Sequence, residues 1–114
     1  MELDKPYSID KLRQYVGDDP EQVREMICLF LDTVPKEVIQ IQDFANKKEW
    51  FEVYKLAHRI KPSFEVFAMD SILDDIKKIE NLARENNVEQ SLDHYIGIFS
   101  DKLNTSVELL KTEL

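Results

Sequence analysis

Residues 19–44 read DPEQVREMICLFLDTVPKEVIQIQDF and carry the strongest helix signal in the chain. Asp19 is a good N-cap, Pro20 suits the first helical position because its missing N–H costs nothing there, and Gln22 completes a capping box. Apolar residues then recur at spacings of three and four, which predicts one buried face of a long helix. They are Val23, Met26, Ile27, Phe30, Val34, Val38, Ile41 and Phe44. Pro35 lies within this run and should kink the helix.

Four further amphipathic segments follow the same period of about 3.6 residues. A short first helix should lie between Ser8, its N-cap, and Gly17, which ends it. The third helix should begin at a capping box from Asn46 to Glu49. The fourth should run from Asp70 to Asn86-Asn87, and the fifth carries the apolar series from Leu92 to Leu110. With 2 Gly and 4 Pro, the chain has too few turn residues for a β-sandwich or barrel. The sequence therefore predicts an all-α fold, an antiparallel up-down four-helix bundle with a short extra N-terminal helix, in a single domain over residues 1–114.

The chain of 114 residues is acidic, with 15 Lys and Arg against 23 Asp and Glu and a formal net charge of −8. This balance argues against a nucleic-acid partner, which requires a positive surface to displace counterions from phosphates, and against binding to anionic membranes. No apolar run reaches the roughly 18 residues of a membrane span, and no signal-peptide pattern is visible. Cys28 is the single cysteine, so no internal disulfide can form. We expect a cytoplasmic monomer.

Most catalytic and metal-binding patterns are absent from the sequence. The two glycines are isolated, so there is no phosphate-binding loop, and no Cys/His spacing fits zinc. A carboxylate-bridged di-iron centre would need Glu three residues before a histidine, but Lys55 stands before His58 and Ser91 before His94. We therefore expect no bound metal or cofactor. His94 lies off the apolar stripe of its helix and is interpreted as a surface residue.

His58 lies at the edge of the apolar face of its helix. With Ala57 set at the core direction and about 100° per residue, His58 falls at about 100°, on the flank. Lys61 follows one turn later and is expected as an exposed neighbour. The same flank carries Phe51, Pro62, Glu65 and, if the helix extends so far, Met69. An imidazole, an ammonium and apolar side chains thus lie together on a face of the helix that core packing does not require. An ordinary histidine at the boundary of the core would give the same pattern.

Residues 56–63, LAHRIKPS, resemble the signature of histidine-containing phosphotransfer (HPt) domains. That signature is alanine-histidine, two residues, lysine, usually glycine, and a small residue, on one helix of a four-helix bundle. The opening LRQYVGDDP (residues 12–20) and the Glu49-Trp50 lead-in to the histidine helix are also typical of the family. Chain length, helix number and acidic charge extend the resemblance over the whole chain. Pro62 departs from the usual glycine.

The resemblance implies a phosphorelay intermediate rather than an enzyme with its own nucleotide site. His58 would accept a phosphoryl group on Nε2 from a receiver-domain aspartate and pass it to another receiver, while Lys61 would stabilise the phosphate charge. The receiver supplies Mg²⁺ and most of the charge stabilisation, so the chain itself would need no cofactor. The implied partners are response-regulator receiver domains and a hybrid sensor histidine kinase.

A receiver should dock around His58. We expect Phe51 to be an exposed apolar anchor, with Lys55, Glu65 and Met69 near its rim. Pro62 lacks the N–H that would bond to the His58 carbonyl, so the helix should bend or loosen beside the reactive side chain.

Two other interpretations remain open. The chain could be an interaction-only bundle that binds a receiver or another partner without accepting phosphate, which the departure at Pro62 favours. It could also be an unrelated four-helix enzyme or ligand-binding domain, although polar residues converge only around His58. Transfer of phosphate from a charged receiver would separate the first of these from an HPt function.

Overall fold

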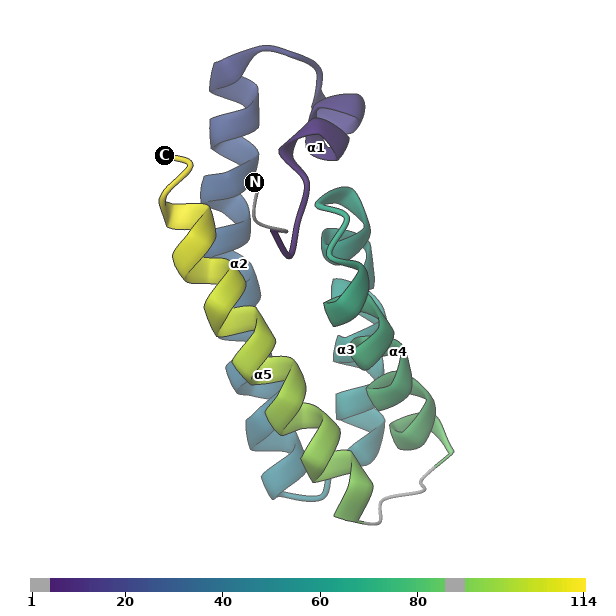
Figure 1. Cartoon of the computed structure of the whole chain (residues 1–114). Helices are drawn as coiled ribbons and strands as arrows, with labels where there is room; N and C mark the ends of the chain where they lie inside the picture. The colour runs from purple at the N-terminus through teal and green to yellow at the C-terminus, as the bar shows by residue number, and fades with distance from the viewer. Residues whose placement is uncertain (1–4, 86–89) are drawn as a thin grey trace.

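The computed structural model describes residues 5–85 and 90–114, and the regular structure in these parts of the chain is entirely α-helical (Figure 1). The helices are α1 (Ile9–Val16), α2 (Pro20–Asn46), α3 (Trp50–Val66), α4 (Asp70–Arg84) and α5 (Gln90–Lys111). Helices α2 to α5 contact their neighbours in chain order, α5 packs back on α2, and α1 contacts α2 and α3. The predicted up-down four-helix bundle with a short extra helix is confirmed.

The first helix begins and ends at the predicted residues, and the second begins after its predicted N-cap. The Ser8 side chain accepts a hydrogen bond from the Lys11 amide, and Gly17 ends α1 with a φ of 93°, a conformation that glycine adopts without steric cost. Asp19 caps α2 by accepting from the Glu21 amide at 3.0 Å. The predicted end of the fourth helix at Asn86-Asn87 lies outside the described residues.

The boundary between α2 and α3 differs from the prediction. Asn46 is the last residue of α2 rather than an N-cap, and Glu49 precedes α3 without a side-chain capping bond. The chain turns through Lys48, whose φ is 59°, and the Glu49 amide donates to the Phe44 carbonyl at 2.9 Å. The predicted capping box at Asn46 is wrong because the apolar face of α2 continues to the buried Ala45, which carries the helix past Phe44.

Two prolines lie inside helices without ending them. α2 runs through Pro35 and α3 runs through Pro62. Because proline has no backbone N–H, the carbonyls of Leu31 and His58 lose the donor one turn ahead. At Pro62, α3 does not end but continues to Val66.

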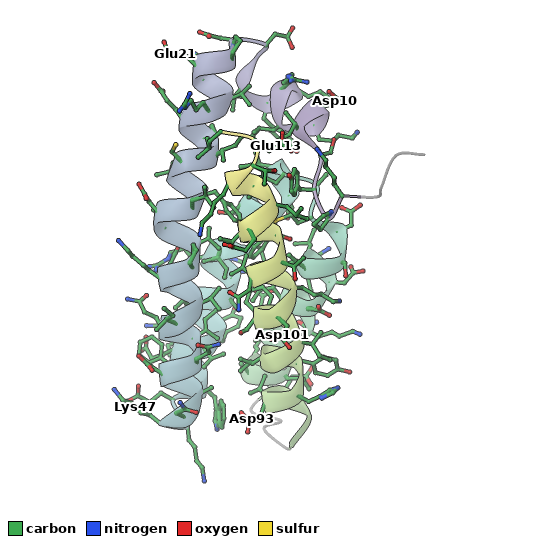
Figure 2. The ribbon with its side chains drawn as sticks, turned by 60° about the vertical axis from the view of Figure 1, so that its left-hand side comes forward. Asp10, Glu21, Lys47, Asp93, Asp101 and Glu113 are labelled. Atoms are coloured by element: carbon green, nitrogen blue, oxygen red, sulfur yellow. The ribbon has the colours of Figure 1, made fainter. Side chains whose placement is uncertain are left out.

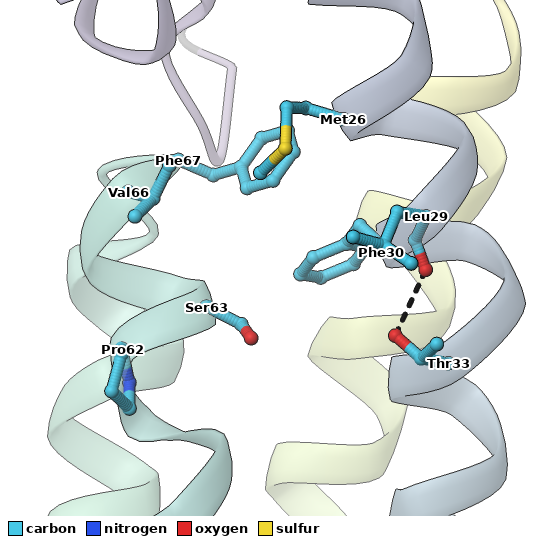
Figure 3. A pocket seen from close by; sticks show the side chains of 8 residues that line it. All are labelled: Met26, Leu29, Phe30, Thr33, Pro62, Ser63, Val66 and Phe67. Carbon is cyan, nitrogen blue, oxygen red and sulfur yellow. Dashed lines mark hydrogen bonds between the residues drawn. The ribbon is translucent and has the colours of Figure 1, made fainter. Parts of the chain in front are cut away.

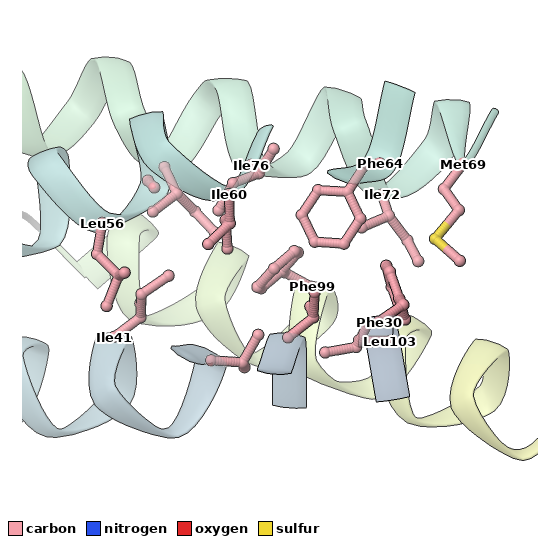
Figure 4. Packing of buried hydrophobic residues seen from close by; sticks show 14 of the residues in the cluster. Phe30, Ile41, Leu56, Ile60, Phe64, Met69, Ile72, Ile76, Phe99 and Leu103 are labelled. Atoms are coloured by element: carbon pink, nitrogen blue, oxygen red, sulfur yellow. The ribbon is translucent and has the colours of Figure 1, made fainter. Parts of the chain in front are cut away.

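Three phenylalanine rings meet at the centre of the core. Phe64 of α3 lies edge-on to Phe30 of α2, with ring centroids 6.1 Å apart, and to Phe99 of α5, at 5.7 Å (Figure 4). All three side chains are buried, and aromatic pairs of this kind contribute about 0.5–1.5 kcal/mol beyond the area they bury. These contacts fix the rotation of α3 about its axis, which determines the side chains that its outer face presents.

The N-terminal segment is tied to the last turn of the chain. The hydroxyl of the buried Tyr7 donates to Glu113 Oε2 at 2.7 Å, and Lys5 Nζ lies 3.0 Å from the same oxygen. Figure 2 shows Glu113 at the end of the bundle where Asp10 of α1 lies, with Asp93 at the far end of α5. A carboxylate thus joins the two ends of the described chain.

Candidate functional site

His58 lies on the outer face of α3, and its side chain is 65% exposed. Ala57 and Ile60 are buried, so packing holds the helix in place while the imidazole stays open to solvent. The predicted position at the edge of the apolar face is confirmed. Because the ring itself is mostly free of packing contacts, its orientation must come from specific side-chain partners.

A buried glutamate on the neighbouring helix provides that partner. Glu80 of α4 is 8% exposed, and its Oε2 lies 2.6 Å from His58 Nδ1. A carboxylate can only accept a hydrogen bond, so the ring nitrogen that faces it carries the proton; this tautomer is assigned from the contact. The other ring nitrogen, Nε2, then carries a lone pair with which no described residue forms a hydrogen bond.

Lys61 shares the same carboxylate. Its Nζ lies 2.6 Å from Glu80 Oε1, so each oxygen of Glu80 contacts one of the two site residues. The Lys61 side chain is only 22% exposed. The expectation of an exposed Lys61 is therefore wrong, because its place one turn after His58 turns it toward α4, where it pairs with Glu80.

Glu80 remains charged despite its burial. Burial alone would raise the pKa of Glu80, but the hydrogen bonds from Lys61 and His58 outweigh it and the net shift is downward. The carboxylate contacts the lysine ammonium with one oxygen and the imidazole with the other. A buried carboxylate that is satisfied by two donors holds both in defined positions more firmly than an exposed ion pair does.

The surface of α3 before His58 is a row of aromatic rings. Phe51 is 66% exposed, its ring centroid is 6.2 Å from that of Tyr54, and Tyr54 is 6.2 Å from the imidazole. Lys55 Nζ lies 5.0 Å from the Phe51 ring centroid. The predicted exposure of Phe51 is confirmed. Tyr54 is partly buried against the core, and its ring lies between Phe51 and His58 in this row.

A groove of about 200 Å³ lies between α2 and α3 and begins one turn beyond His58 (Figure 3). Its lining is apolar except for two hydroxyl side chains, and consists of Met26, Leu29, Phe30, Thr33, Pro62, Ser63, Val66 and Phe67. Thr33 uses its hydroxyl to donate to the Leu29 carbonyl at 2.8 Å. The sequence does not predict this groove, because its width depends on the separation of two helices rather than on the pattern within either.

Met69 does not belong to the surface around His58. α3 ends at Val66, the chain turns through Ala68 with a φ of 52°, and Met69 becomes the residue before α4. Its side chain is 0% exposed and points into the core (Figure 4). Its predicted place at the rim of a docking surface is wrong, because helical spacing was extended past the end of the helix.

Glu65 and Lys55 are exposed, as the predicted docking surface requires. Lys55 Nζ lies 3.1 Å from Glu52 Oε1, one turn earlier on the same helix. Arg59, on the other side of His58, reaches Glu37 of α2 at 3.1 Å. Charged side chains of both signs therefore surround the imidazole and its aromatic neighbours.

The other singled-out residues lie apart from this site. His94 is exposed on α5 beside Tyr95, and Cys28 is partly buried on α2. Within residues 5–85 and 90–114, no three His, Cys, Asp or Glu side chains gather closely enough to hold a metal ion.

None of the described helices is both long and apolar enough to span a membrane.

Glu80 is the site residue that sequence reasoning missed. It follows Ile76 by four residues and precedes Ala83 by three, so it falls on the buried stripe of α4 among apolar residues. A glutamate at such a position requires partners, because an unpaired buried carboxylate is costly. That placement was visible in the sequence, but the identity of the partners depends on how α3 and α4 pack.

No family model matches the chain, and no match is found among curated proteins or among solved structures. The resemblance to HPt domains therefore rests on the sequence features quoted above.

Proposed function

We propose that the chain is a phosphorelay intermediate of the HPt type. His58 accepts a phosphoryl group from the aspartyl phosphate of one receiver domain and passes it to the aspartate of another. The observation that carries the proposal is the 2.6 Å contact between His58 Nδ1 and the buried Glu80, on an imidazole that is 65% exposed. This combination provides a nucleophile that is fixed in one tautomer and open to a large partner.

Phosphoryl transfer through His58 requires few catalytic groups from this chain. An imidazole nitrogen with a free lone pair is nucleophilic without an added base, so Nε2 can attack phosphorus directly. Positioning and charge stabilisation supply most of the catalysis of phosphoryl transfer, and the receiver brings its own Mg²⁺ for this purpose. On the histidine side, Lys61 is a cation one turn away that can meet the incoming negative charge.

The surroundings of His58 fit a transient protein partner. Phe51 and Tyr54 offer apolar area beside the nucleophile, and Lys55 and Glu65 offer charges of both signs. An exposed phenylalanine among polar residues suits an anchor that enters a pocket on a partner. We assign receiver docking to this face of α3.

The test is phosphoryl transfer from receivers of the same genome that have been charged with labelled acetyl phosphate. The wild-type chain should acquire an acid-labile, base-stable label, as expected of a phosphoramidate. His58→Gln should abolish the label, and the matched control His94→Gln should retain it, because His94 is the other exposed histidine.

Two results would contradict the proposal. Label that persists in His58→Gln would place the phosphoryl group elsewhere. A wild-type chain that binds charged receivers without acquiring label would make it an interaction-only bundle.

A further inference from the structure

Glu80 contacts the one nitrogen of His58 that does not react. Its Oε2 accepts the Nδ1 proton at 2.6 Å, and its Oε1 is occupied by Lys61 at 2.6 Å. The carboxylate is 8% exposed, so water competes little for either oxygen. Addition of a phosphoryl group at Nε2 would not displace this contact, because the two ring nitrogens are separate positions.

We propose that Glu80 keeps the proton on Nδ1 after Nε2 has been phosphorylated, which makes the phosphohistidine short-lived and ready to transfer. This inference rests on the proposed function of His58 and adds a role for Glu80 in the phosphorylated state. Glu80 is a positioning residue here, since it acts through Nδ1 and does not touch the phosphorus.

The bond changes balance without any proton leaving the ring. In the uptake step, the Nε2 lone pair forms the N–P bond, the P–O bond of the acyl phosphate breaks, and its electron pair goes to the receiver carboxylate. The ring gains a positive charge, which the adjacent Glu80 carboxylate compensates. In the onward step, a carboxylate oxygen of the second receiver attacks phosphorus, the N–P bond breaks, and its electron pair returns to Nε2.

The Nδ1 proton determines the leaving group of the onward step and of hydrolysis. With the proton in place, Nε2 leaves as part of a neutral imidazole. Without it, the ring would have to leave as an imidazolate anion, which is a much poorer leaving group. A fixed carboxylate at Nδ1 therefore favours the reactive form of the phosphohistidine.

The other charged and titratable groups around His58 do not replace Glu80. They are Tyr54, Lys55, Arg59, Lys61 and the exposed Glu65 on α3, Lys77 and Arg84 one turn from Glu80 on α4, and Glu37 on α2. Most are cationic, and a cation opposes a proton on Nδ1. Glu37 is bonded to Arg59 at 3.1 Å. Glu80 is the carboxylate that contacts the ring directly.

The test measures the lifetime of the phosphohistidine without any receiver. The intact chain is phosphorylated with phosphoramidate, the donor is removed, and loss of the N–P signal is followed by phosphorus NMR over a range of pH. Glu80→Gln is the informative variant, because its amide oxygen can still accept from Nδ1 while the negative charge is gone.

At about pH 8, we expect the phosphohistidine of Glu80→Gln to last about tenfold longer than that of the wild type, because a neutral amide holds the Nδ1 proton less firmly than a carboxylate does. At about pH 5, the two lifetimes should converge, because the ring is then protonated in both. Equal lifetimes at every pH, or a shorter lifetime in Glu80→Gln, would overturn the proposal.

His94 provides a matched control. It is an exposed histidine for which no hydrogen bond to a carboxylate is found among the described residues. In a His58→Gln background labelled at His94, adding Glu80→Gln should leave the lifetime unchanged. If the two backgrounds respond alike, the effect of Glu80 is not exerted through His58 and the proposal fails.

Lys61→Met gives a second measurement that does not depend on the folding of Glu80→Gln. It removes the competing cation and keeps the carboxylate on Nδ1, so the lifetime at about pH 8 should shorten. A longer lifetime in Lys61→Met would contradict the role assigned to Glu80.

Transfer from the phosphorylated chain to receivers separates this inference from the proposed function. If no receiver takes up the group, the relay function fails, whatever the lifetimes are. If receivers take it up but Glu80→Gln and the wild type have equal lifetimes and equal transfer rates, the relay function stands and the role of Glu80 fails.

Discussion

Two carboxylates in this bundle have similar partners, but they differ in whether the carboxylate or its aromatic partner is the more deeply buried group. Glu80 binds one lysine and one aromatic ring, His58, and Glu113 binds one lysine and one aromatic ring, Tyr7. At the first site, the carboxylate is buried and the ring is exposed. At the second, the Tyr7 ring is 5% exposed and the Glu113 side chain is 22% exposed.

The difference separates a structural contact from the contact that we propose to orient a reactive ring. Burial and the bond to Glu113 raise the pKa of Tyr7, so its hydroxyl stays a donor and the contact joins the ends of the chain. At Glu80, the group left in solvent is a ring nitrogen with a free lone pair. The same kinds of bond therefore stabilise the fold at the Tyr7 site and leave a ring nitrogen, the proposed nucleophile, in solvent at the His58 site, according to which partner is covered.

The largest expected effect on stability is at the terminal site. Tyr7→Ala removes a buried aromatic side chain and should lower the free energy of unfolding by about 3 kcal/mol, while phosphoryl uptake by the folded fraction is retained. Urea unfolding measures this loss. The matched control is Tyr15→Ala, because Tyr15 is 65% exposed and its removal should change stability by no more than about 0.5 kcal/mol. Equal losses in both variants would refute the assignment of Tyr7 to a buried structural contact.

Glu80 should contribute to stability in a pH-dependent way. Its pKa is lowered in the fold, so its contribution is fully present above the ordinary glutamate value of 4.5 and is lost as the pH falls through the lower folded value. At neutral pH, Glu80→Gln should cost about 1 kcal/mol, since its partners are partly exposed. The difference between wild type and variant should shrink on acidification below pH 4.5, whereas Glu65→Gln, an exposed control on α3, should show no such trend.

Phe51 should have the smallest effect on stability and a measurable effect on binding. Phe51→Ala removes a side chain that is 66% exposed, so unfolding should change by about 0.5 kcal/mol or less. The Kd for a receiver should rise by about fivefold or more, as for an interface anchor. Calorimetric titration measures the Kd, with Ile39→Ala on α2 as an exposed apolar control. An unchanged Kd would remove Phe51 from the docking surface.

The buried and exposed faces within one helix were predictable from the sequence, whereas the capping box at Asn46 and the contacts between two helices were not. The exposure of His58 and Phe51 follows from the period of α3 alone, and the helix order follows from repeated apolar stripes. The contact of Glu80 with His58 requires the packing of α3 against α4, which no single-helix pattern contains. Met69 was misplaced for a related reason, because the turn at Ala68 breaks the helical spacing that was used to position it.

The most direct test is a nitrogen-15 NMR spectrum of the His58 ring, recorded before and after phosphorylation by a charged receiver. The geometry predicts a protonated Nδ1 and an unprotonated Nε2 in the free chain, because Glu80 lies 2.6 Å from Nδ1. After phosphorylation, Nε2 should couple to phosphorus while Nδ1 keeps its proton. A free chain with the proton on Nε2, or a phosphoryl group found on Nδ1, would contradict the assignment of His58 as a nucleophile oriented by Glu80.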